Sequence, residues 1–143
     1  FELDGTPEDV LAKLLDFEHA DGHRAWAKAH TNVRRNGDET IAHWQFNGKA
    51  GVNPDCDIVF TTIRRKSDIV LRFKQKEPVF GLAAFFGDYR LQAAGAARTK
   101  VTARVFIASG ILIADASLEE IADGLREDAK LLADWKRLGA RGP

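Results

Sequence analysis

The sequence has little of several residues that mark specialised classes of protein. Its 143 residues include one cysteine, so an internal disulfide is excluded and a thiolate metal centre is not expected. The 21 Lys and Arg residues balance the 21 Asp and Glu residues, and a net charge of zero argues against binding to nucleic acid. No apolar run approaches the ~20 residues that a membrane-spanning helix needs. We therefore expect no stable insertion into a membrane.

The N-terminal segment also lacks the features of an export signal. Phe1–Asp4 has neither the basic nor the apolar region of a signal peptide, so the expected compartment is the cytoplasm. The chain contains no methionine, and we expect a few residues to precede Phe1. A composition of 45% hydrophobic and 29% charged residues is that of an ordinary globular protein. The length suits one domain over residues 1–143.

Two segments have the apolar spacing of amphipathic helices. Thr6 and Asp9 make a capping box around a proline, and apolar residues at intervals of three or four predict a helix from residue 7 to about Phe17. A loop or one short helical turn should follow. Ser117 opens a second capping box, and the same spacing predicts a helix to about Leu138. At ~1.5 Å per residue this helix would be about 33 Å long, enough to cover a sheet lengthwise.

Between the two helices, the pattern changes to alternating strands separated by turn residues. Strands are expected at 57–65, 69–77, 84–94 and 99–108, after a hairpin that turns at Asn36-Gly37-Asp38. No helix separates the strands, so the sheet should be antiparallel, with one face buried and one in water. Both possible registers of the hairpin place the same residues on one face: Ala29, Thr31, Val33, Ala42, Trp44 and Phe46.

Basic residues alternate with the apolar ones in the later strands and should line the outer face of the sheet. This stripe could attract an acidic partner protein or anionic headgroups, or it could be an ordinary solvated face balanced by acids of the last helix. The residues concerned are Arg72, Lys74, Lys76, Arg90, Lys100 and Arg104.

The order of elements resembles the START-like superfamily, also called SRPBCC, which includes the birch-pollen allergen, polyketide cyclases and lipid-transfer domains. The resemblance rests on Phe1–Val10 with Leu14–Phe17, on Gly87–Leu91 with Thr99–Val105, and on the capped C-terminal helix. It implies an α+β helix-grip fold: a curved antiparallel seven-stranded sheet around a long C-terminal helix, with short N-terminal helices. It also implies an apolar cavity between sheet and helix, which takes a small hydrophobic ligand without a cofactor.

Two glycines bear on this cavity. Gly124, in the middle of the last helix, would leave room for a guest, although it could instead permit close packing or face solvent. Gly87, inside an apolar strand, could mark a bulge or bend of a curved sheet. The residues expected to line the cavity are Trp44, Phe46, Phe60, Thr62, Leu71, Phe73, Gln75, Phe85, Tyr89, Leu91, Val105, Ile121, Gly124 and Leu125.

Few residues suggest catalysis. The alternation of its strand places Tyr89 inward, where its phenol could donate to a substrate carbonyl, and Arg64 could lie near the cavity mouth and hold a carboxylate. The thiol of Cys56 lies between Asp55 and Asp57, whose charges raise its pKa and argue against a catalytic thiolate. Of the four histidines, His19 and His23 have the i, i+4 spacing that could present two nitrogens to a metal, but only if that segment were helical, so no metal is expected. Phosphate-binding and nucleophile motifs are absent from the sequence.

The sequence therefore favours binding or transport of a small hydrophobic molecule by a monomer or homodimer. A polyketide cyclase or dehydratase that uses Tyr89 and Arg64 is the alternative enzyme. An interaction module that uses the basic outer face is the third possibility.

Overall fold

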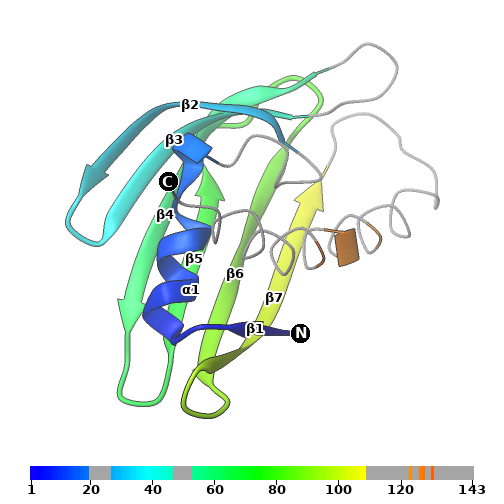
Figure 1. Cartoon of the computed structure of the whole chain (residues 1–143). Coiled ribbons are helices and arrows are strands. Elements are labelled where there is room, and N and C mark those ends of the chain that lie inside the picture. Colours follow the sequence, from blue (N-terminus) through cyan, green and yellow to red (C-terminus); the bar gives the residue numbers. More distant parts are fainter. Residues whose placement is uncertain (20–26, 47–52, 109–122, 124–125, 128–129, 131–143) are drawn as a thin grey trace.

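An antiparallel sheet of seven strands forms the body of the computed structural model, which describes residues 1–19, 27–46, 53–108, 123, 126–127 and 130 (Figure 1). The strands lie in the order β1-β7-β6-β5-β4-β3-β2. Successive strands from β2 to β7 are therefore neighbours, and the last strand, β7, pairs with the first, β1. The elements are β1 (Glu2–Asp4), α1 (Pro7–Leu14), η1 (Phe17–His19), β2 (Ala27–Asn36), β3 (Glu39–Phe46), β4 (Asp55–Arg64), β5 (Ile69–Gln75), β6 (Ala84–Ala93) and β7 (Arg98–Ala108). The predicted antiparallel sheet is confirmed. Within the described residues, no helix has the length and hydropathy to span a bilayer.

Helix α1 begins at the predicted capping box and covers one face of the sheet. The Thr6 backbone N–H donates to Asp9 Oδ2 at 2.8 Å, and the Asp9 backbone N–H donates to Thr6 Oγ1 at 3.2 Å. The helix packs against β5, β6 and β7 (Figure 1). It ends at Leu14, earlier than the predicted end near Phe17. The chain turns there into the short helix η1, and the Phe17 ring enters the core, 4.8 Å from the ring of Phe60.

The hairpin between β2 and β3 has the predicted tight turn, with Asn36 opposite Glu39. Farther from the turn, the predicted pairing is wrong. The register shifts between Thr31 and Arg34, where Asn32 adopts a φ of 50°. An extra residue in one strand reverses which side chains share a face. Thr31 therefore pairs with His43 and is exposed.

The same shift affects the other residues assigned to that face. Ala29 pairs with Gln45, which is not one of the residues predicted to share its face, while Val33 is half-buried against the core. On β3 the prediction is confirmed, because Ala42, Trp44 and Phe46 are buried.

The inner face of the sheet, defined as the face that bears the buried residues of β3–β7 and is covered by α1, holds the hydrophobic core. The outer face carries the exposed cations of β5, β6 and β7, as predicted. It also carries a stacked aromatic pair, Phe86 and Phe106, with ring centroids 4.7 Å apart. Both of these rings are about half exposed.

Gly87 lies opposite Phe73 and Val105 in a register that continues through it without a shift. The bulge considered for this position is therefore absent. A Cβ at Gly87 would lie 2.0 Å from the carbonyl oxygen of Arg104 and 2.7 Å from Phe73 Cζ. The glycine thus lets β7 and the Phe73 ring approach the backbone of β6 closely.

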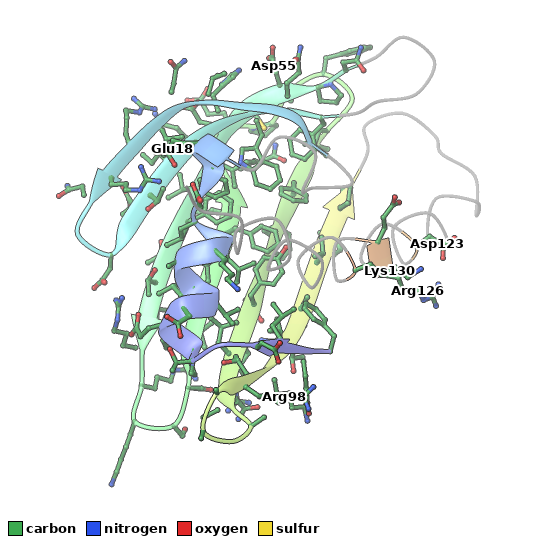
Figure 2. All side chains as sticks on the ribbon, in the orientation of Figure 1. Glu18, Asp55, Arg98, Asp123, Arg126 and Lys130 are labelled. Atoms are coloured by element: carbon green, nitrogen blue, oxygen red, sulfur yellow. The ribbon has the colours of Figure 1, made fainter. Side chains whose placement is uncertain are left out.

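Four residues of the predicted C-terminal helix are described, namely Asp123, Arg126, Glu127 and Lys130. All four have helical backbone and exposed side chains, and Asp123 pairs with Arg126 at 2.6 Å (Figure 2). The long helix expected over residues 117–138 otherwise lies outside the described residues.

Candidate ligand-binding face

Aromatic rings form a connected surface on the inner face. The centroid of the Trp44 ring lies 5.6 Å from that of Phe46 and 5.7 Å from that of Phe60. The centroid of the Phe85 ring lies 6.0 Å from that of Trp44 and 5.1 Å from that of Phe73. All five side chains are buried. The surface spans four strands, from β3 to β6, and is of the apolar, aromatic kind that lines sites for small molecules.

Strand alternation and register together build this surface. On β5, Leu71 and Phe73 point inward while Arg72 and Lys74 are exposed, as the alternation of side chains along a strand requires. Antiparallel pairing then places Phe73 directly opposite Phe60, so rings from neighbouring strands meet.

Several polar side chains interrupt the apolar inner face, among them one each from β4, β5 and β6. Tyr89 is buried, and its ring centroid lies 5.6 Å from that of Phe73. Thr62 is buried opposite Leu71. Gln75 is half-buried at the end of β5, opposite Ile58. A molecule on the inner face would meet these groups as its hydrogen-bond partners.

Solved structures match the chain over nearly its whole length, whereas no family model and no curated protein sequence matches it. The STAR-related lipid transfer protein from Xanthomonas axonopodis has a TM-score of 0.78 at 15% identity, over 95% of this chain and 82% of that one. The Zhui aromatase/cyclase from Streptomyces sp. R1128 has a TM-score of 0.77 at 13% identity, over 99% and 93%. Human STARD10 has a TM-score of 0.67 at 11% identity, over 98% and 64%. The chain has the START-like (SRPBCC) fold.

The START-like fold confirms the predicted resemblance and the predicted sheet. Identities this low show a shared fold, and one fold can host unrelated activities. The chemistry of this chain has to be argued from its own residues.

Arg64 lies at the end of β4, where its side chain meets α1. Its guanidinium donates from Nε to Glu8 at 3.0 Å and from Nη1 to Asp38 at 2.7 Å, and its side chain is half exposed. The hydrogen bond to Glu8 raises the pKa of Arg64 above its usual value. Arg64 pairs with the buried Ile69 and shares the alternation of Thr62, so it keeps the predicted inward direction at the end of β4. Its guanidinium joins α1 to the β2–β3 turn, and its place at a cavity mouth stays a prediction.

Cys56 lies on β4 opposite Trp44 and is buried. Burial, followed by the charges of Asp55 and Asp57, raises the pKa of this thiol to about 11. The thiol is therefore protonated at neutral pH and is a poor nucleophile. The two aspartates are evident from the sequence, whereas burial, which is the larger cause, depends on the fold.

On the outer face, His43 Nδ1 lies 3.0 Å from Asp57 Oδ1, and Arg34 donates to Asp57 Oδ2 at 2.9 Å. The hydrogen bond with His43, with the help of Arg34, lowers the pKa of Asp57 below its usual value. In the part of the chain that the structure describes, no group of three or more His, Cys, Asp and Glu residues could hold a metal ion.

The structure gathers most of the predicted cavity residues on the inner face. Ile121, Gly124 and Leu125 lie outside the described residues. Inner-face residues that the prediction omitted include Cys56 and Ile58, which share the alternation of Phe60 and could have been found from it. The predicted cavity residues that are buried or half-buried on the inner face are Trp44, Phe46, Phe60, Thr62, Leu71, Phe73, Gln75, Phe85, Tyr89, Leu91 and Val105.

Proposed function

We propose that this START-like protein binds a small hydrophobic molecule against the inner face of its sheet. The observation that carries the proposal is the connected aromatic surface from Trp44 to Phe73. Apolar burial drives such binding, and aromatic rings add specific contact energy. The described solved structures include a lipid transfer protein and an aromatase/cyclase, and both descriptions are compatible with an apolar guest.

Neighbouring residues on β6 provide a matched test of which face binds. Phe85 is 2% exposed on the inner face, whereas Phe86 is 47% exposed on the outer face. The probe is N-phenyl-1-naphthylamine, an uncharged dye whose fluorescence rises in apolar surroundings. We expect Phe85→Leu to raise the Kd of the dye about three- to tenfold through the loss of ring contacts. Phe86→Leu should leave the Kd within about twofold.

Circular dichroism should first establish that both variants are folded. Equal effects of the two substitutions, or no dye binding by the unmodified protein, would contradict the proposal. Native mass spectrometry of protein purified from its own host would then identify the class of any co-purified molecule.

An aromatase- or cyclase-type enzyme is the second candidate, and the observation that favours it is the inward, buried phenol of Tyr89. Arg64, the other candidate, is held by Glu8 and Asp38, which weakens this alternative. Among the described residues, no charged side chain other than Asp68 is buried, and Asp68 pairs with Arg90. A general acid or base on the inner face would have to come from elsewhere in the chain.

A further inference from the structure

Gln75 is a polar residue in an apolar row of the inner face. Its backbone lies opposite Ile58 at the end of β5, and its side chain has the same inward direction as Leu71 and Phe73. Ile58 in turn pairs with the buried Ala42. The neighbouring side chains across β3 and β4 thus provide no polar group in this row.

Two hydrogen bonds fix the orientation of the Gln75 amide. Its Nε2 donates to the carbonyl oxygen of Glu77 at 3.0 Å and to that of Leu82 at 3.1 Å. A rotation that exchanged the amide oxygen and nitrogen would bring three oxygens together without a proton between them. The nitrogen therefore faces the two carbonyls, and Oε1 faces away from them.

The turn from Val79 to Leu82, which supplies one of these carbonyls, is fixed by its own backbone hydrogen bonds. Val79 and Leu82 exchange two backbone hydrogen bonds, at 3.1 and 3.0 Å, and Gly81 between them adopts a φ of 83°. Leu82 is buried in the core. The Gln75 amide is thus anchored to a structured turn before any ligand arrives.

The oxygen of this amide is left without a donor. Gln75 Oε1 is buried and has no hydrogen-bond partner among the residues that the structure describes. A buried acceptor without a donor is unfavourable, and most buried polar atoms in proteins are paired. A molecule that supplied an O–H or N–H group here would satisfy the oxygen at no cost in reorienting the side chain.

We propose that Gln75 Oε1 is the specificity-determining acceptor of the binding face and selects apolar molecules that carry a neutral hydrogen-bond donor, such as a phenol or an alcohol. This inference rests on the proposed function. Esters, ethers and ketones present only acceptors and are disfavoured. Ionised carboxylates are disfavoured more strongly, since none of the described cations is buried and Arg64 already has two carboxylate partners.

A matched pair of ligands tests the inference. 2-Naphthol and 2-methoxynaphthalene share one ring system and differ in whether the oxygen carries a proton. Each is titrated against protein loaded with N-phenyl-1-naphthylamine, and its Kd is obtained from displacement of the dye. The unmodified protein should bind the naphthol about five- to tenfold more tightly, the value of one neutral hydrogen bond in a buried site.

Gln75→Met keeps the length of the side chain and removes the acceptor. In this variant, the ratio of the two Kd values should fall to about one. The dye carries an N–H group of its own, so its Kd should rise as well, and each naphthalene Kd is calculated with the dye Kd measured in the same variant. Lys74→Met, on the same strand with an exposed side chain, is the control and should keep the full ratio.

The outcomes separate the inference from the function on which it rests. A ratio near one in the unmodified protein, as expected when a buried water already satisfies Oε1, overturns the inference and leaves dye binding intact. A ratio that survives Gln75→Met also overturns it. Absence of dye binding refutes the proposed function itself. If Gln75→Met does not fold, a ratio near one in the unmodified protein still refutes the inference.

Discussion

Replacement of Gly87 by alanine should destabilise the protein more than its single methyl group suggests. The new Cβ would lie 2.0 Å from the carbonyl oxygen of Arg104 and 2.7 Å from Phe73 Cζ. The Phe73 ring could turn aside, but the carbonyl belongs to the backbone of β7, which is paired with β6 on both sides of this point. Strands β6 and β7 would have to separate locally by more than about 1 Å, given that nonbonded contacts are favourable only at ~3.5 Å and beyond.

The expected cost lies at the upper end of overpacking, about 3 kcal/mol or more. For a chain of this size, that corresponds to a fall in Tm of roughly 10 °C. Thermal and urea unfolding, followed by circular dichroism, measure both quantities. Gly37→Ala is the control, because a Cβ there meets nothing within 4 Å and the cost is limited to the φ of 59°. That cost is about 1–2 kcal/mol.

Phe73→Leu in the Gly87→Ala background distinguishes the two contacts. Since the smaller side chain relieves only the ring contact, it should recover little of the lost stability. Full recovery would show that the Arg104 carbonyl is not the obstacle. A Gly87→Ala variant as stable as Gly37→Ala would refute the argument for close strand approach altogether.

Three further predictions concern individual side chains. The Cys56 thiol, with its pKa raised to about 11, should react with Ellman's reagent at pH 8 about a hundredfold more slowly than in urea-unfolded protein, because so little thiolate is present. Asp57 has a pKa below its usual 3.8 when folded, so its stabilising contribution is full well above that pH and lost below it. The unmodified protein should therefore lose more stability than Asp57→Asn between about pH 5 and pH 3 in urea titrations. Tyr89→Phe should weaken ligand binding about fivefold at most, whereas a turnover defect of ~100-fold with unchanged binding would favour the cyclase alternative.

Local signals in the sequence predicted much of the fold. The capping box at Thr6 and the alternation along β5 and β6 involve residues close together in the chain, so they predicted where α1 begins and that Tyr89 points inward. The end of α1 was mispredicted because the chain leaves the helix after Leu14 and buries Phe17 in the core. The contacts that bury Phe17 come from distant strands, so no local sequence pattern indicates them.

The candidate site depends more on contacts between distant residues. Arg64 is neutralised by Glu8, which is 56 residues away, and this pairing exists only once α1 packs on the sheet. Likewise, the bulge near Asn32 depends on the pairing of β2 with β3. This bulge places Thr31 on the exposed face. The alternation of side chains along β5 predicts that Gln75 points inward. Only the folded turn at Leu82, which accepts a hydrogen bond from the Gln75 amide nitrogen, shows that the amide oxygen has no donor among the described residues.

The bulged strand β2 has a consequence for how copies of this chain behave in concentrated solution. Within the described structure, the sheet is open, with β1 and β2 at its edges. β1 has three residues, and the pairing of β2 with β3 is interrupted at two places. An added strand from another molecule needs a long, regular row of unpaired backbone groups. Neither edge offers one, so the sheet resists growth into fibrils despite its strongly apolar strands.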